Sequence, residues 1–357
     1  MKTRTITMVF WATLLLVSCN TKFKGQNKIE QIRGVSLIKN EAGKKVDVMI
    51  DGKLFTSYLW PDDVMKPVLY PVYTSSGTEV TRGFPIKPRA GERADHPHHV
   101  GIWLNYGYVN GYDFWGTSYA IPEAKRMASY GSIKHLSVDQ LSGGKSEGTL
   151  VTSESWVTSS DKELLAEKTE YRFIVKGATR IIDRITTLTA SSENVSLKDT
   201  KEGMFAIRVA RQLELPSKEN IILTDDKGNP ETVKKMTNES VSGAYRSSEG
   251  IINEKVWGTR AKWMNLYGYI GDEKIAVVML DHPKNPNYPT YWHAREYGLF
   301  SLNPFGVKDF TEGKQELNYS ISAGKSITLR YRVIIHSGSH LNDSEIEAFA
   351  NDFSKKY

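Results

Sequence analysis

A long alternating stretch near the end of the chain constrains the fold most. In residues 326–336 apolar side chains occupy every second position, at Ile327, Leu329, Tyr331, Val333 and Ile335, and the polar Thr328, Arg330 and Arg332 lie between the first four of them. A two-residue period describes a β-strand with one buried face. Further strand-like stretches lie at residues 46–50, 54–60, 169–175, 180–190, 195–199, 205–213, 275–281 and 299–303. The chain is therefore expected to be rich in strands.

Turn and helix signals complete this picture. Asp51 and Gly52 separate the first two strand-like stretches and predict a hairpin. Helical spacing is confined to the C-terminus, where Ile346, Phe349, Ala350 and Phe353 recur at the helical period and Ser344 and Glu347 suggest a capping box. No internal linker rich in Pro, Ser or Gly divides the chain. We predict one all-β domain over residues 29–357, a large antiparallel β-sandwich with a short C-terminal helix.

The first residues are typical of an export signal. Lys2 and Arg4 precede a short apolar run, and Leu-Val-Ser-Cys ends at Cys19. This resembles a bacterial lipobox, so we expect residues 1–18 to be a signal peptide, Cys19 to be lipidated and residues 19–28 to be a tether. The domain would be exported and lipid-anchored to a bacterial membrane, on its periplasmic face or at the cell surface. Cys19 is the only cysteine, which excludes an internal disulfide.

Composition narrows the classes of partner. The net charge is +6, but the basic residues are scattered and form no block interleaved with aromatic residues, so we predict no nucleic-acid binding. The 8 tryptophans and 18 tyrosines are compatible with stacking on sugar rings as well as with core packing.

Histidines mark the first candidate site. Residues 93–103 contain His96, His98 and His99, three of the 8 histidines in the chain. In an extended segment His96 and His98 share one face, and Pro97 places the segment at a sheet edge or rim. Histidine suits proton transfer, metal ligation or hydrogen bonding near neutral pH. Residues 281–295 repeat the Asp-His-Pro triplet at His282, and we expect the two stretches to converge.

Residues 199–210 form a third candidate. In an extended strand Phe205, Ile207 and Val209 face the core, whereas the opposite face carries Glu202, Met204, Ala206, Arg208 and Ala210. A carboxylate and a guanidinium separated by small side chains leave room for a ligand. The alternative is a solvated face with a surface ion pair.

Several motifs together resemble a known family. They are Thr-Arg-Gly-Phe-Pro at 81–85, Asp-His-Pro-His-His-Val-Gly-Ile-Trp at 95–103, Asp-Phe-Trp-Gly at 113–116, Asp-Thr-Lys-Glu-Gly at 199–203 and Tyr-Pro-Thr-Tyr-Trp-His-Ala-Arg at 288–295. They resemble the PmoA-like family of unknown function from Bacteroidetes and Planctomycetes. The family's methane-oxygenase label does not suit this chain, which has no internal membrane span. The resemblance implies a role in polysaccharide or glycoside use and a fold similar to the galactose-mutarotase-like supersandwich.

We therefore expect an enzyme that acts on a carbohydrate, either a glycoside or a keto-sugar, as a lyase, hydrolase or epimerase. The catalytic candidates are His98, His293 and Glu202. The substrate-binding candidates are Arg82, His99, Trp103, Lys201, Arg208, His282, Tyr291 and Arg295. One alternative is a divalent metal held by His96 and His98 and completed by Glu202 or His293. The other is a glycan-binding lipoprotein without catalysis. We expect no other cofactor, and no membrane contact beyond the lipid anchor.

Overall fold

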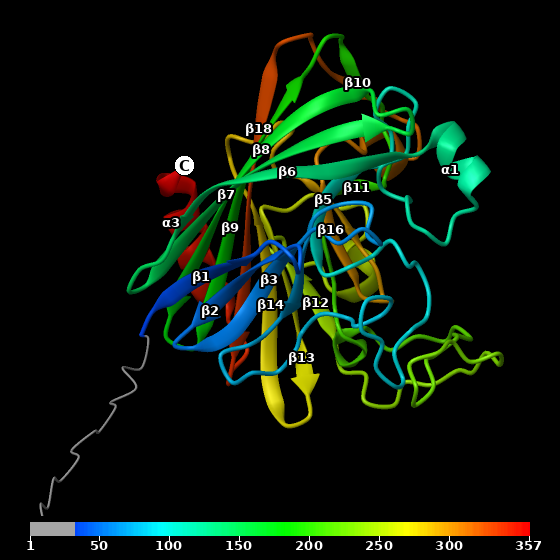
Figure 1. Cartoon of the computed structure of the whole chain (residues 1–357). Coiled ribbons are helices and arrows are strands. Elements are labelled where there is room, and N and C mark those ends of the chain that lie inside the picture. The colour runs from blue at the N-terminus through cyan, green and yellow to red at the C-terminus, as the bar shows by residue number, and fades with distance from the viewer. Residues whose placement is uncertain (1–32) are drawn as a thin grey trace, which may run out of the picture. The chain divides into compact units, whose positions relative to one another are not determined.

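The computed structural model describes residues 33–357, which form two eight-stranded antiparallel sheets and a short two-stranded ribbon (Figure 1). The first sheet contains, in spatial order, β1 (Val35–Asn40), β2 (Lys45–Ile50), β3 (Lys53–Leu59), β4 (Val68–Val72), β5 (Ile102–Tyr106), β11 (Gly203–Arg208), β16 (Leu299–Asn303) and β15 (Tyr291–Ala294). The second contains β12 (Ala244–Ser247), β13 (Trp263–Ile270), β14 (Glu273–Asp281), β18 (Ser326–Ser337), β9 (Thr179–Ala190), β8 (Glu163–Lys176), β7 (Glu147–Thr158) and β6 (Gly131–Ser142). The ribbon pairs β10 (Val195–Leu197) with β17 (Tyr319–Ile321).

Helical elements are few and short within residues 33–357. They are α1 (Glu123–Ser129), η1 (Arg211–Leu213), η2 (Asn253–Val256), α2 (Val307–Phe310) and α3 (Asp343–Lys356). The all-β prediction with a C-terminal helix is thus confirmed. None of these helices is long and apolar enough to cross a bilayer. The predicted signal peptide, lipidated Cys19 and tether fall outside the residues that the structure describes.

The two sheets share one hydrophobic core. Leu329, Tyr331 and Val333 of β18 point into it, as their alternation predicts. The Tyr331 ring stacks on Phe205 of β11, with ring centres 5.2 Å apart, so that the core joins the sheets face to face. Apolar burial on this scale is the main favourable contribution to folding.

The outer faces of the two sheets are covered differently. Helix α3 lies on the second sheet, where Ile346 and Phe353 pack against Trp263 and Ile334. The capping box is formed by Asn342 and Glu345, not by the predicted Ser344 and Glu347. The Asn342 side chain accepts a hydrogen bond from the Glu345 amide (3.0 Å), and the Glu345 carboxylate accepts one from the Asn342 amide (2.8 Å). Loops cover the outer face of the first sheet instead, where Val64, Ile86 and Val100 pack in one cluster with Trp103 and Ala206. The candidate site lies on this face.

Two other local predictions have clear outcomes. The hairpin is present between β2 and β3, with Asp51 and Gly52 both at positive φ. The strand predicted over residues 205–213 ends at Arg208 in β11, and η1 replaces its second half. Val209 and Ala210 still bond to neighbouring segments through their amides, so the backbone leaves the ladder without losing these hydrogen bonds.

Candidate functional site

A row of four residues crosses the outer face of the first sheet. Ala206 of β11 pairs with Trp103 of β5 on one side and with Ser301 of β16 on the other, and Ser301 pairs with His293 of β15. At about 4.8 Å per strand, the Trp103 and His293 backbones are roughly 14 Å apart. Small side chains therefore separate two groups of functional residues. Met204 was expected on this face, but it belongs to the shared core.

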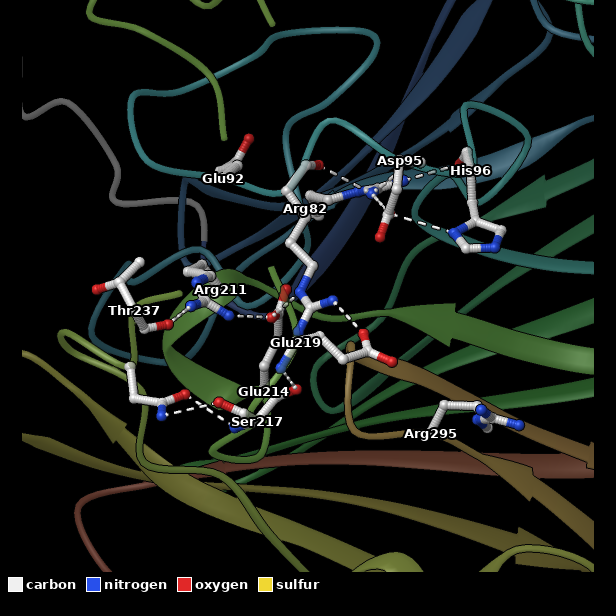
Figure 2. Close-up of polar contacts among 12 residues, drawn as sticks. Arg82, Glu92, Asp95, His96, Arg211, Glu214, Ser217, Glu219, Thr237 and Arg295 are labelled. Carbon is white, nitrogen blue, oxygen red and sulfur yellow. Dashed lines mark hydrogen bonds and ion pairs between the residues drawn. The ribbon is translucent and has the colours of Figure 1, made fainter. Parts of the chain in front are cut away.

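Arg82 organises the loop that carries the histidine cluster. Its guanidinium donates to the main-chain oxygens of Arg93 (3.1 Å), Asp95 (2.8 Å), His96 (2.9 Å) and His99 (3.1 Å). Figure 2 shows it beside Asp95, whose carboxylate it also contacts at 2.7 Å. The sequence suggested that Arg82 binds substrate. The structure buries it and directs both of its terminal nitrogens to this loop, so it positions the loop instead.

Asp95 and Arg208 connect this loop to β11. Arg208 is fully buried and donates to the Asp95 carboxylate (2.6 Å) and to Nδ1 of His99 (3.2 Å). Burial alone would raise the pKa of Asp95, but the charges of Arg208 and Arg82 hold it well below its usual range. Because a guanidinium only donates, Nδ1 of His99 is the acceptor and the ring proton is on Nε2.

The histidine cluster continues as a set of nearly parallel rings. His96, at positive φ and exposed, stacks on Tyr297 (ring centres 5.0 Å apart) and on His99 (4.8 Å). His99 in turn stacks on Trp103 at 5.4 Å. Burial lowers the pKa of His99 and of His98 well below the usual value, so both rings are neutral at neutral pH.

The metal alternative depends on a ligand set around His96 and His98. Their rings are 5.7 Å apart between centres and nearly perpendicular. Within residues 33–357, no three His, Cys, Asp or Glu side chains lie so that they could hold a metal ion. Neither Glu202 nor His293 therefore completes a site with this pair, and a metal stays a prediction without a ligand set in this part of the chain.

The second group of functional residues lies around His293. Its Nδ1 donates to the main-chain oxygen of Lys201 (3.0 Å), so Nε2 carries the lone pair. The Glu202 carboxylate is 4.0 Å from Nδ1 and also pairs with the Lys201 ammonium. Burial lowers the pKa of His293 to about 4, against an opposing effect of Glu202. The imidazole is thus a neutral acceptor at neutral pH.

Tyr297 connects the two groups. Arg208 and Arg295 lie over its ring, at 5.0 Å and 5.7 Å from the centre. Burial raises the pKa of Tyr297 to about 12; the two arginines lower it, whereas Glu202 and Asp95 raise it further. Charged groups from both predicted stretches therefore act on one phenol. Of the second stretch, Arg295 thus meets the residues of the first through Tyr297, whereas His293 stays in the separate group across the sheet.

Two predicted residues lie elsewhere. His282 is buried beside Phe353 of α3 (ring centres 5.0 Å apart), against the second sheet, and its Nδ1 accepts the Lys284 amide (3.1 Å). The repeated Asp-His-Pro triplet there forms a local turn in which Asp281 accepts the Thr290 amide (2.9 Å). Tyr291 is buried against Phe310 of α2, with ring centres 5.2 Å apart. His282 therefore does not join the other candidates, whereas Tyr291 shares Phe310 with His293, whose ring centre is 6.3 Å from that of Phe310.

Sequence reasoning missed three contributors. Asp95 was in the motif but was given no role, although an acid beside a histidine cluster is a recognisable signal. Tyr297 lies two positions beyond Arg295 and could have been found as the next residue on that stretch. Lys66 carries no sequence signal, yet its ammonium donates to the His98 main-chain oxygen (2.7 Å) and lies 5.3 Å from the centre of the Trp103 ring.

Comparison with known proteins places the chain in a family. Residues 45–351 match a family of unknown function (DUF6807), and the chain belongs to that family. The match assigns no activity, so the PmoA-like name stays a resemblance. No curated protein matches the chain.

Distant likenesses to solved structures were also found. The galactosidase domain of alpha-galactosidase-sucrose kinase, AgaSK, is 10% identical with a TM-score of 0.38, over 85% of this chain and 42% of that one. A beta-arabinopyranosidase is 13% identical with a TM-score of 0.31, over 87% and 39%. A galactose mutarotase-like protein from Lactobacillus casei is 11% identical with a TM-score of 0.31, over 85% and 100%. The chain spans about two fifths of the first two, and likenesses at these TM-scores carry no argument about its chemistry.

Proposed function

We propose that this protein is an enzyme that acts on a carbohydrate through acid-base chemistry at His293. The observation that carries the proposal is the fixed tautomer of His293, whose Nδ1 donates to the Lys201 carbonyl while Glu202 lies 4.0 Å away. The His293 ring is therefore neutral, and its Nε2 has an unshared lone pair. This is the arrangement that a general base needs before the reaction.

The proton transfer follows from these contacts. The lone pair of Nε2 accepts a proton from a carbon or hydroxyl of the sugar, and the ring becomes an imidazolium. The nearby Glu202 carboxylate stabilises this cation, since its charge already raises the pKa of His293. When the proton comes from carbon, reprotonation of that carbon on its opposite face by a second acid gives epimerisation. Expulsion of a neighbouring leaving oxygen, which takes up the proton, gives elimination instead. Hydrolysis requires that Nε2 deprotonate a water that attacks the glycosidic carbon, while the leaving oxygen takes up a proton. His98, half-buried in the loop, is the second candidate for a proton-transfer role.

Substrate contacts come from the exposed edge of the site. The side chains of Lys201 and Arg295 are 41% and 34% exposed, so they are accessible cations that can hold a carboxylate or developing oxyanion. The exposed ring of His96 offers a surface against which a sugar ring can lie. Arg208 is buried and acts on the substrate only through Asp95, His99 and Tyr297.

Turnover would test the proposal. The full chain, purified in detergent, is incubated with p-nitrophenyl glycosides and with the same glycosides oxidised to keto-sugars, and the products are followed by NMR. His293→Ala and Glu202→Gln are expected to lower turnover about 100-fold or more. His340→Gln, which changes a histidine bonded to the Gly268 carbonyl away from the site, is the matched control. Sugar binding without any turnover would instead identify a glycan-binding protein.

We also propose that the protein is an exported lipoprotein anchored through Cys19, on the basis of the N-terminal sequence alone. Labelling cells with a palmitate analogue tests this, because Cys19→Ala should abolish the label and prevent signal cleavage. An unlabelled wild-type protein in the soluble fraction would refute it.

A further inference from the structure

One lysine is buried beside the histidine cluster. Lys66 is 2% exposed and is the only buried lysine in residues 33–357. Its ammonium donates to the His98 carbonyl at 2.7 Å, and no carboxylate oxygen in this part of the chain lies within 4.0 Å of it. An ammonium has three N–H groups, so Lys66 has capacity for further acceptors. A buried cation without a carboxylate partner is unfavourable unless a ligand completes it.

Four further buried donors nearby lack hydrogen-bond partners. His99 Nε2 carries the ring proton, because Nδ1 faces the Arg208 guanidinium, and Nε2 has no hydrogen-bond partner. The Trp115 indole Nε1 is also buried without one. Both rings pack against Trp103: the ring centre of His99 is 5.4 Å from that of Trp103, and the ring centre of Trp115 is 5.3 Å from it. The Lys66 ammonium lies over the same indole, 5.3 Å from its centre. The Thr117 and Ser118 hydroxyls, just after Trp115, are likewise buried and unpartnered.

These groups share one chemistry, since all of them can donate a hydrogen bond. Asp113 is the carboxylate whose charge acts on Lys66, and its Oδ1 already accepts the Trp115 and Gly116 amides at 2.8 Å. Unpaired buried polar groups are rare in proteins and call for an explanation. A ligand with two acceptor oxygens and a negative charge would satisfy several of them at once.

A cleft gives access to Lys66. Its volume is about 420 Å³, within the usual range of small-molecule sites, and Lys66, Trp60, Tyr119 and His135 contribute to its lining. The Trp60 ring stacks on His135, with centres 4.1 Å apart, and Tyr119 is 52% exposed. Aromatic side chains of this kind are suited to contact with a sugar ring. The cleft thus combines a surface for a sugar with the Lys66 donor. His99 and Trp115 do not contribute to its lining; they lie around Trp103, over which the Lys66 ammonium also lies.

We propose that Lys66, His99 and Trp115 form a pocket for the carboxylate of an acidic sugar, a uronate. The choice of a sugar as the carrier of that carboxylate rests on the proposed function, whereas the carboxylate itself follows from the unpartnered donors. The carboxylate oxygens accept from Lys66 Nζ, His99 Nε2 and Trp115 Nε1, and the sugar ring lies in the cleft.

Proton uptake should accompany binding. Burial lowers the pKa of Lys66 to about 7, so part of the free protein carries a neutral amine at pH 7. A bound carboxylate raises this pKa, so binding takes up a fraction of a proton per site. Neighbouring groups that titrate or carry charge are His98, Asp113 and His135, and the ion pairs Lys44 with Asp62 and Lys134 with Asp161.

Isothermal titration calorimetry of the full chain in detergent tests the pocket with D-glucuronate, D-glucose and acetate at pH 7. Repeating the titrations in buffers of different ionisation enthalpy measures the proton uptake. Glucuronate should bind at least tenfold more tightly than either of the others, with proton uptake. Equal binding of glucose would overturn the carboxylate pocket, and equal binding of acetate would overturn the sugar class.

Variants locate the effect. Lys66→Met should weaken glucuronate binding at least tenfold and abolish proton uptake, whereas Lys134→Met, on the same cleft, should change neither. Trp115→Phe removes one donor and should weaken binding several-fold, which keeps the test decisive if Lys66→Met fails to fold. No change in any Lys66 or Trp115 variant that folds would refute the assignment.

The proposed function is tested separately by His293→Ala. This variant should retain glucuronate binding within about threefold while losing turnover. Selective glucuronate binding with turnover that does not depend on His293 would refute the catalytic role and leave the pocket intact.

Discussion

Asp95 is the residue whose replacement tests the organisation of the site most directly. Its Oδ1 accepts from Arg82 at 2.7 Å and from Arg208 at 2.6 Å, and these two guanidinium groups are 1% and 0% exposed. Asp95→Asn keeps the size of the side chain but removes the charge that both arginines face. Breaking a buried ion pair from one side costs about 3–5 kcal/mol, because a charge is left buried and unpaired.

We expect the lower end of that range, about 3 kcal/mol, because the Asp95 side chain is 31% exposed and water partly screens it. For about 325 ordered residues, an unfolding entropy of about 2.1 cal/mol/K per residue converts this loss into a fall in Tm of about 4 °C. Differential scanning calorimetry and urea denaturation at pH 7 measure both quantities.

The pH dependence gives a second, independent check. The folded pKa of Asp95 is held below its unfolded value of about 3.9, so its stabilisation is fully present above that value and is lost as the pH falls below it. The difference between wild type and Asp95→Asn should therefore be constant from pH 7 to about pH 5 and shrink towards pH 3. A difference that stays constant down to pH 3 would contradict the charge argument.

Asp352→Asn is the matched control. Asp352 also pairs with a buried arginine, Arg332, but it is 67% exposed, and Arg332 retains the buried Asp183. Its replacement should cost less than about 1 kcal/mol. If Asp95→Asn cost no more than this control, the two arginines would not depend on Asp95, and the account of the loop would be wrong.

Two further predictions concern residues away from the proposed reaction. Burial and the charge of Glu167 raise the pKa of Glu154 to about 8, above its unfolded value, so its cost to stability grows as the pH rises from about 4 to about 8. Glu154→Gln should match the wild type in urea denaturation at pH 4 and exceed it at pH 8; equal stability at both would refute this. His282→Leu should lower the free energy of unfolding by about 1 kcal/mol through the lost bond to the Lys284 amide, with glycoside turnover unchanged. Lost turnover at normal stability would return His282 to the site.

The sequence predicted those features that depend only on residues close to one another along the chain. The alternation in residues 326–336 identified β18 and its core face, and Asp51-Gly52 identified the hairpin. The residues Ala206 and Arg208 were correctly placed on the face opposite Phe205 because a strand has a fixed two-residue period. These predictions required no knowledge of which strands pair.

Long-range pairing could not be predicted in the same way. Asp95 and Arg208 are 113 positions apart and meet only because β5 and β11 are neighbours in the first sheet. Identical Asp-His-Pro triplets have different environments, since Asp95 faces two arginines whereas Asp281 accepts the amides of its own turn. Lys66 is an ordinary lysine in sequence and becomes unusual only through burial.

The balance of charge at the site connects its stability with its ligand. Arg82 and Arg208 are buried cations around one loop, and Lys66 adds a third when it is protonated. Among the carboxylates of residues 33–357, only Asp95 contacts any of the three within 4.0 Å. Folding therefore holds more positive than negative charge in a region of low dielectric, at a cost that core packing offsets. An anionic ligand bound in the pocket would remove part of that cost, so its binding should raise the Tm of the protein. Buried donors without partners are unfavourable in the fold. The same donors would give the pocket its selectivity for a carboxylate over a neutral sugar.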